Sequence, residues 1–197
     1  MRSYVLQSPY LCLNPDYNQM RKLKNSELGR KSVKEYKKAD KFPIIVVLDN
    51  VRSLNNIGSV FRTSDAFLVN AVYLCGITAK PPNKGIQKTA LGATESVSWK
   101  YYESTVEAIH ELKADGYDII SVEQAEEAVS LENFTVKKTG KYAVIFGHEV
   151  RGVSQEVVDL SDYCVEIPQF GTKHSFNISV SAGIVLWELF NRLDFNK

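Results

Sequence analysis

Short runs of β-branched and aliphatic residues recur along the chain, separated by polar stretches. The first run, IIVVLDN, covers residues 44–50 and follows Pro43. A continuous apolar run bounded by turn-forming residues is typical of a strand buried on both faces of a parallel sheet. The same pattern predicts five further strands, at residues 71–77, 96–102, 117–123, 141–147 and 164–169.

Apolar residues at helical spacing lie between several of these runs. They predict helices over residues 55–69, 105–114 and 179–192, and Ser104 is suited to cap the second of them. A poorly amphipathic helix is expected over residues 15–41, and PPNKG at 81–85 predicts a loop. Strands that alternate with helices predict an α/β fold: a mostly parallel sheet with helices on both faces.

The size and composition fit one ordinary globular domain. The chain has 197 residues, of which 44% are hydrophobic and 24% charged. No apolar run approaches the roughly 18 residues of a membrane span, and the first residues lack the apolar core of a signal peptide. Three widely spaced cysteines form neither a zinc motif nor a disulfide framework, so we expect a cytoplasmic protein with no membrane contact.

The charge is distributed unevenly. Residues 1–41 hold ten Lys/Arg and four Asp/Glu, a net +6, whereas residues 42–197 hold 14 and 19, a net −5. This predicts a basic N-terminal arm on a separate domain. A polyanionic partner is one interpretation of the arm, and a solvated helix with lysines on its outer face is the other.

Several common chemistries have no motif in this chain. The turn after the first strand has a single glycine, which excludes the GxGxxG pattern of dinucleotide-binding proteins. There is no GxxxxGK[ST] phosphate-binding loop and no GxSxG nucleophile elbow. The three histidines lie on separate segments without metal-ligand spacing, so no metal site is expected.

Three segments combine polar residues and glycines at the expected carboxyl ends of buried strands, where open α/β sheets bind ligands. In residues 48–67, Asn55 and Asn56 lead into a helix that carries Arg62. In residues 144–158, two glycines flank Glu149 and permit close backbone approach. Each segment also has a purely structural explanation. In the first, the asparagines would be helix caps and Arg62 a surface residue, and the second would be an ordinary strand-to-helix turn.

The third segment, residues 166–190, is harder to explain by stability alone. A polar loop with Ser175 and Asn177 directly precedes a helix that begins with small residues. That helix continues with an apolar stripe at Val180, Ile184, Trp187 and Phe190, which fits either core or an interface between copies.

In this order, the three segments resemble the three motifs of the SPOUT superfamily, specifically the TrmH-like RNA ribose 2′-O-methyltransferases. The resemblance covers about residues 42–193. The matching positions are Asn56 and Arg62 in motif 1, Gly147, Glu149 and Gly152 in motif 2, and Ile167 to Val180 in motif 3.

The resemblance implies an α/β-knot with a deep C-terminal trefoil, an S-adenosylmethionine pocket that needs no metal, and a homodimer. Departures from the family pattern are Phe176, where leucine is usual, and Gln124, where an apolar residue is expected. The positions matching cofactor contacts are Gly147, Ile167, Phe176 and Gln124. The positions matching the catalytic group are Arg62, Asn56, Glu149, Ser175 and Asn177.

The implied reaction is methyl transfer to a ribose 2′-OH. Within the family, residues 119–131 and 164–171 look most like the branch that methylates a guanosine of the tRNA D-loop. An rRNA enzyme of the same family, a knot protein that binds RNA without catalysis, and an unrelated nucleotide-binding domain are the alternatives. Arg62 is expected either to handle the hydroxyl proton or, since arginine is normally protonated, to stabilise the developing alkoxide.

Overall fold

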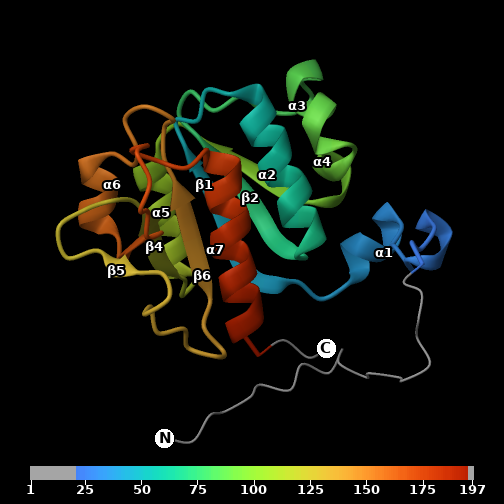
Figure 1. Cartoon of the computed structure of the whole chain (residues 1–197). Coiled ribbons are helices and arrows are strands. Elements are labelled where there is room, and N and C mark those ends of the chain that lie inside the picture. Colours follow the sequence, from blue (N-terminus) through green and yellow to red (C-terminus); the bar gives the residue numbers. More distant parts are fainter. Residues whose placement is uncertain (1–20, 195–197) are drawn as a thin grey trace, which may run out of the picture. The chain divides into compact units, whose positions relative to one another are not determined.

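A computed structural model describes residues 21–194 of the chain (Figure 1). The chain divides into two compact units, residues 1–32 and 33–197. In the described part of the first unit, a 3₁₀ turn spans Asn25–Glu27. The Glu27 carboxylate accepts hydrogen bonds from both Arg21 Nη atoms, at 3.0 and 2.9 Å, and from the Lys24 N–H at 2.6 Å.

The second unit is built on a parallel sheet. Within residues 21–194 it has seven strands in the order β3-β2-β1-β6-β4-β7-β5, and every neighbouring pair is parallel. The strands are β1 (Phe42–Asp49), β2 (Val69–Cys75), β3 (Ser98–Tyr102), β4 (Asp118–Val122), β5 (Val129–Ser130), β6 (Tyr142–Phe146) and β7 (Tyr163–Glu166). The helices are α1 (Val33–Lys38), α2 (Leu54–Ala66), α3 (Lys84–Ala90), α4 (Ala93–Ser96), α5 (Thr105–Ala114), α6 (Gln155–Leu160) and α7 (Ile178–Arg192).

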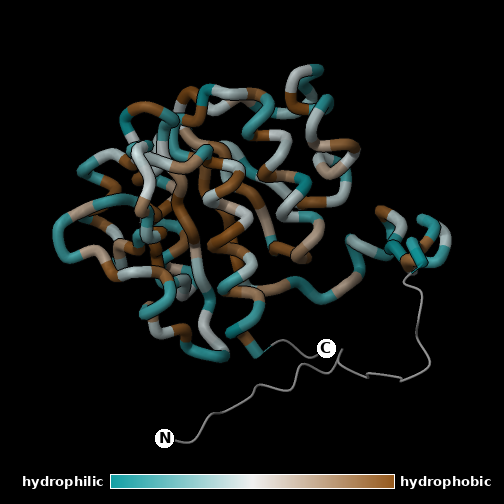
Figure 2. Tube along the Cα trace, viewed as in Figure 1, coloured by the Kyte–Doolittle hydropathy of each residue, from teal (hydrophilic) through white to brown (hydrophobic). Residues whose placement is uncertain are grey.

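Helices cover both faces of this sheet, as predicted. Successive residues of β1 alternate between two cores: Ile44 and Val46 pack with α2 and α7, and Ile45 packs with α5 and α6. The buried strands form the brown interior of Figure 2. A strand with apolar residues on both faces has no solvent side, which is why its sequence is continuously hydrophobic.

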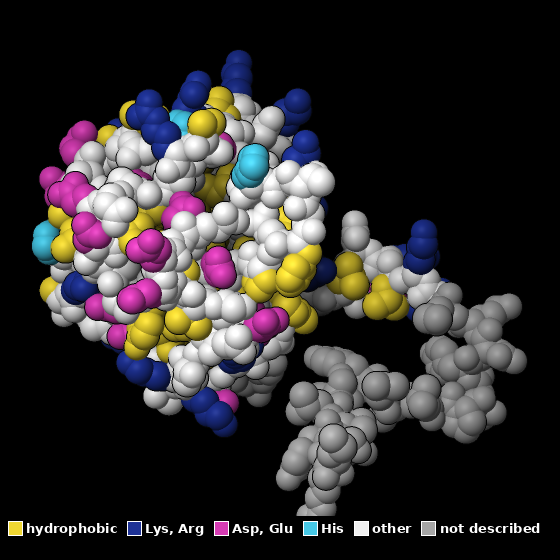
Figure 3. Space-filling model, turned by 60° about the vertical axis from the view of Figure 1, so that its left-hand side comes forward, with side chains coloured by type: hydrophobic (Ala, Val, Ile, Leu, Met, Phe, Trp, Pro, Cys, Tyr) yellow, Lys and Arg dark blue, Asp and Glu magenta, His cyan; other side chains and the backbone are white. Residues whose placement is uncertain are grey.

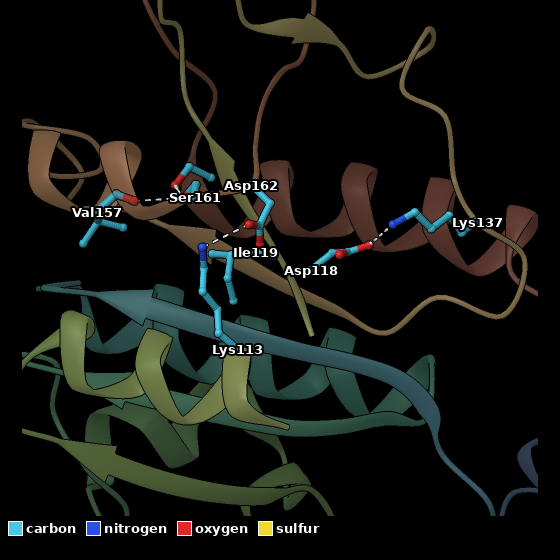
Figure 4. A network of polar contacts seen from close by, with 8 residues as sticks. Lys113, Asp118, Ile119, Lys137, Val157, Ser161 and Asp162 are labelled. Atoms are coloured by element: carbon cyan, nitrogen blue, oxygen red, sulfur yellow. Dashed lines mark hydrogen bonds and ion pairs between the residues drawn. The ribbon is translucent and has the colours of Figure 1, made fainter. Parts of the chain in front are cut away.

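Polar contacts surround the start of β4 (Figure 4). Asp162, just before β7, accepts hydrogen bonds from the Ile119 N–H at 2.8 Å and from Lys113 Nζ at 3.0 Å. Lys137 pairs with Asp118 at 2.9 Å. These lysines are therefore neutralised by neighbouring carboxylates.

Several predicted boundaries need correction. Residues 21–41 do not form one helix, because Gly29 adopts a left-handed conformation (φ +57°) and only the 3₁₀ turn and α1 are helical; residues 15–20 lie outside the described part. Tyr36 of α1 belongs to the core of the second unit. Part of the predicted 81–85 loop is helical, because Asn83 caps α3 by accepting from the Gly85 and Ile86 N–H groups. Strand β3 starts at Ser98, after α4, and the two-residue β5 was not predicted.

The trefoil knot and the absence of a membrane span were also expected. The knot stays a prediction. Within the described residues, the longest helix, α7, has 15 residues, and none has the length and hydropathy needed to cross a membrane.

Candidate active site

A cavity of about 470 Å³ opens at the carboxyl ends of β4, β6 and β7. This volume is typical of small-molecule sites, which enclose about 300–1,000 Å³. Its walls come from four segments that are far apart in sequence: residues 122–124, 146–152, 166–169 and 174–181. The arrangement agrees with the rule that open parallel sheets bind ligands at this edge.

The loop after β6 forms a tight turn with its backbone facing the cavity. His148 and Gly152 exchange two backbone hydrogen bonds, at 3.0 and 2.8 Å. Gly152 has a φ of +67°, and a Cβ on Gly147 would overlap the backbone of Gly152 and Val153. Both glycines are therefore required by the geometry, since any side chain at Gly147 would push the turn open.

The imidazole of His148 holds the same turn from inside. Its Nδ1 accepts hydrogen bonds from the N–H groups of Val150 and Arg151, at 3.0 and 3.3 Å. The ring therefore satisfies two backbone N–H groups at the tip of the turn. This role was not foreseen from the sequence.

Glu123, at the end of β4, braces the turn from the other side. Its Oε2 accepts from the Val153 N–H and its Oε1 from the Gln124 N–H, both at 2.9 Å. The carboxylate also lines the cavity. Sequence analysis missed this residue, although its position at the carboxyl end of the predicted strand 117–123 was a usable signal.

Glu149 joins this loop to the turn between β1 and α2. Its Oε1 accepts from the Ser53 N–H at 2.9 Å and from Asn56 Nδ2 at 3.1 Å, and its Oε2 accepts from the Arg52 N–H at 3.1 Å. Burial acts to raise the pKa of this carboxyl, but the hydrogen bonds outweigh burial and hold the pKa below the ordinary glutamate value. The carboxylate therefore occupies the electropositive N-terminus of α2.

Asn56 and Asn177 extend the connection to the third segment. Asn177 Nδ2 donates to Asn56 Oδ1 at 3.2 Å. Asn177 Oδ1 accepts from the Ser179 N–H at 2.9 Å and so caps α7. One chain of hydrogen bonds, Glu149–Asn56–Asn177, thus links all three motif segments.

The loop before α7 closes the remaining side of the cavity. Residues 170–177 are exposed, and Ser175, Phe176 and Asn177 line the cavity. Gln124 Nε2 donates to the carbonyl oxygen of His174 at 3.1 Å, which fastens this loop to the end of β4.

A buried carboxylate lies beneath the site. Asp49, at the end of β1, is 2% exposed. Its Oδ1 accepts from Thr105 Oγ1 at 2.5 Å and from Asn50 Nδ2 at 2.8 Å, and its Oδ2 accepts from the Ser154 N–H at 3.4 Å. It thereby ties β1 to the starts of α5 and α6. Sequence analysis did not single it out.

The structure gathers all but one of the predicted residues. Asn56 contacts two residues of the cavity wall, Glu149 and Asn177. Arg62 is exposed on α2 and does not line the cavity. It lies six positions after Asn56, about 9 Å further along the helix axis. The predicted residues that line the cavity are Gly147, Ile167, Phe176, Gln124, Glu149, Ser175 and Asn177.

Comparison with protein families gives one match over most of the chain. Residues 43–187 match the family model described as the SpoU rRNA Methylase family. The match begins inside β1 and ends within α7, so it includes all three motif segments.

Curated relatives act on two kinds of RNA. The chain is 32% identical over 147 residues to a tRNA (guanosine(18)-2′-O)-methyltransferase of Borreliella burgdorferi, covering 75% of this chain and 66% of that protein. It is 31% identical to the enzyme of the same name from Aquifex aeolicus, covering 74% and 67%. A 23S rRNA (guanosine-2′-O-)-methyltransferase of Neisseria meningitidis is 32% identical, covering 74% and 57%. The matched region thus spans about two thirds or less of these relatives.

Solved structures share the fold. The TrmH/SpoU tRNA modifying enzyme of A. aeolicus is 29% identical, with a TM-score of 0.70 over 80% of this chain and 78% of that one. An AdoMet-bound rRNA methyltransferase from Sinorhizobium meliloti, 23% identical, aligns with a TM-score of 0.73 over 81% and 61%.

Proposed function

Because the chain belongs to the SpoU rRNA methylase family, we propose that it is an S-adenosylmethionine-dependent RNA methyltransferase that modifies a ribose 2′-OH. The observation that carries the proposal is the cavity, in which Gly147 and Glu149 of the second motif meet Asn177 of the third. If these residues only stabilised the fold, no cavity between the three hydrogen-bonded loops would be needed.

The cavity fits S-adenosylmethionine in size and chemistry. Its wall includes the tight backbone turn at Gly147 and the apolar residues Ile167 and Phe176, which suit the planar adenine ring. The carboxylates of Glu123 and Glu166 also line it and favour a cationic sulfonium. When bound, this cofactor supplies the methyl group; no metal ligand set is part of the proposal.

The chain's own residues orient the ribose and stabilise charge. Ser175 and Asn177 offer hydrogen-bonding groups at the cavity wall. A ribose hydroxyl is a poor nucleophile at neutral pH, so loss of its proton needs electrostatic help. Arg62 provides a permanent positive charge and a planar fork of donors suited to a phosphate, and we assign it stabilisation of the developing alkoxide.

The distance of Arg62 from the cavity supports a homodimer in which Arg62 of one protomer completes the cavity of its partner. Two further side chains support an interface: on α7, Val180 is 47% and Trp187 55% exposed. Both belong to the apolar stripe of that helix, whose Phe190 packs on Phe42 and Phe67.

The proposed substrate is tRNA. Support comes from the two tRNA (guanosine(18)-2′-O)-methyltransferases, of which the matched region covers a larger share than of the rRNA enzyme. The equal identity of the rRNA enzyme keeps 23S rRNA as the second candidate. The basic residues 1–41 would add affinity for either polyanion. The cytoplasm is the proposed compartment, since both cysteines in the described part of the chain are free.

The test is transfer of label from methyl-labelled S-adenosylmethionine to purified tRNA and rRNA, in separate reactions in chelator-treated buffer. We expect label in tRNA, inhibition by S-adenosylhomocysteine and no loss with chelator. Asn177→Ala serves as the site control and is expected to transfer little label. If the folded protein binds the cofactor by calorimetry but labels neither RNA, the proposed activity is wrong.

A further inference from the structure

Two apolar side chains in the loops that build the cavity are almost fully exposed. Phe170 is 97% and Val150 84% exposed, the highest values among the large hydrophobic residues of the described chain. A phenylalanine in this position forgoes the favourable free energy of burial. Their exposed apolar surface is available for contact with a ligand.

Both side chains belong to loops that build the cavity. Val150 is part of its wall, at the tip of the turn held by His148. Phe170 directly follows Gln169, another wall residue, so their Cα atoms are about 3.8 Å apart. Phe170 therefore adjoins the cavity wall in the chain, while its own side chain extends outside that wall into solvent.

Each of these apolar residues has an exposed cation close by in sequence. Arg151 follows Val150, and Lys173 lies three residues after Phe170. Neither cation forms an ion pair with a described residue, whereas Lys113 and Lys137 on another face are paired with aspartates (Figure 4). Figure 3 shows lysine and arginine side chains gathered along the upper edge of the molecule.

An aromatic face beside unpaired cations matches the chemistry of a nucleotide. A base stacks on an aromatic ring, and its phosphates bind cations. A second copy of the chain is a poorer match, because a symmetric contact through Phe170 would bring the Arg151 and Lys173 charges of both copies together. An interface between two copies can instead use the exposed apolar side chains of α7.

We propose that Phe170 is a positioning residue on which the base of the target nucleotide stacks while its ribose enters the cavity. The inference rests on the proposed RNA methyltransferase function. Because every base has an aromatic face, stacking holds the nucleotide in place without selecting one base. The contact forms outside the cofactor cavity, so Phe170 contributes to RNA binding and not to cofactor binding.

The test compares Phe170→Ala, Phe170→Leu and Phe170→Trp, with unfractionated tRNA as the RNA. Phe170→Ala and Phe170→Leu are expected to weaken tRNA binding and raise its KM about tenfold, the scale of one lost base stack, and Phe170→Trp to restore both. Calorimetry should give unchanged S-adenosylhomocysteine affinity. Leu91→Ala is the control, because Leu91 is 67% exposed but does not line the cavity.

Each other outcome overturns the inference in a distinguishable way. Full activity of Phe170→Leu means that any apolar side chain suffices, and unchanged tRNA binding by Phe170→Ala removes the contact altogether. A shift of Phe170→Ala toward monomers in sedimentation assigns the side chain to an interface between copies. If the wild-type protein neither binds nor methylates RNA, the proposed function fails first and this inference with it. Thermal unfolding verifies that each variant is folded.

Discussion

At the scale of single residues, the site is held together by the Glu149 carboxylate. It accepts three hydrogen bonds from the start of α2, and one of its donors, Asn56, reaches Asn177 at the start of α7. A charged acceptor makes stronger hydrogen bonds than a neutral one. Glu149 therefore positions the loops around the cavity and does not need to touch the reacting atoms.

Replacing this charge gives a pH-dependent effect on stability. The pKa of Glu149 is lowered in the folded protein, so its stabilising contribution is complete above the unfolded value of about 4.3 and is lost as the pH falls through the folded pKa. Glu149→Gln should lower the free energy of unfolding by about 1–3 kcal/mol at pH 7. Urea unfolding should show this difference shrinking as the pH falls below the unfolded value of about 4.3. A difference that is independent of pH would mean that the charge is unimportant.

Arg62 tests whether charge alone is sufficient for catalysis. Arg62→Ala and Arg62→Lys should both reduce single-turnover methyl transfer by at least about a hundredfold, because lysine keeps the charge but loses the planar fork. Cofactor affinity and thermal stability should remain near the wild-type values, since Arg62 is exposed and outside the cavity wall. A near-normal rate for Arg62→Ala would refute its assignment.

The sequence indicates which residues belong to the site better than it indicates their hydrogen-bond partners. Asn56, Glu149 and Asn177 were singled out by motif and position, but their mutual hydrogen bonds join residues up to 121 positions apart. Such pairings depend on tertiary structure. Glu123 and His148 were missed because their role is to hold a backbone turn, which leaves no periodic pattern in the sequence.

At the scale of elements, the turn between β6 and α6 is the most constrained part of the site. Gly147→Ala would force the turn away from Gly152, and we expect cofactor affinity to fall at least about tenfold, as for an overpacked site. Gly58→Ala is a matched control, since its Cβ would overlap the backbone of α3 but it does not line the cavity. Calorimetry with S-adenosylhomocysteine and thermal unfolding should separate the two variants. Equal cofactor affinity of Gly147→Ala and the wild type would contradict this role of the turn.

Buried strands were the elements easiest to predict. Continuous apolar runs marked β1, β2 and β6 to within two residues, because both of their faces are covered by helices. Short elements such as α3 and β5 were not predicted, since seven or two residues give too little periodicity. The expected helix over residues 15–41 was wrong within its described part, where Gly29 interrupts it.

At the scale of the whole molecule, the proposed dimer predicts complementation between defective protomers. Arg62→Ala retains the cavity, and Gly147→Ala retains the arginine. If Arg62 acts in the partner's cavity, a co-expressed mixture should regain about a quarter of wild-type activity, since half of the dimers would then hold one complete site. No activity above that of the separate variants would show that Arg62 acts within its own chain or that no dimer forms.

The path of the chain is the least predictable feature at this scale. A knot depends on which segment passes through which loop, and hydrophobic patterning carries no such information. The predicted trefoil therefore rests on the family resemblance. The sheet order, with β6 between β1 and β4, is likewise a result of long-range pairing.

The most direct measurement is the position of the transferred methyl group. A methyl group on the 2′-oxygen blocks alkaline cleavage of the adjoining phosphodiester, because that cleavage needs the free hydroxyl. After reaction with labelled S-adenosylmethionine, alkaline hydrolysis of tRNA should leave the label in dinucleotides, and nucleoside mass spectrometry should place it on ribose. Label recovered in mononucleotides, with the methyl group on a base, would contradict the central claim.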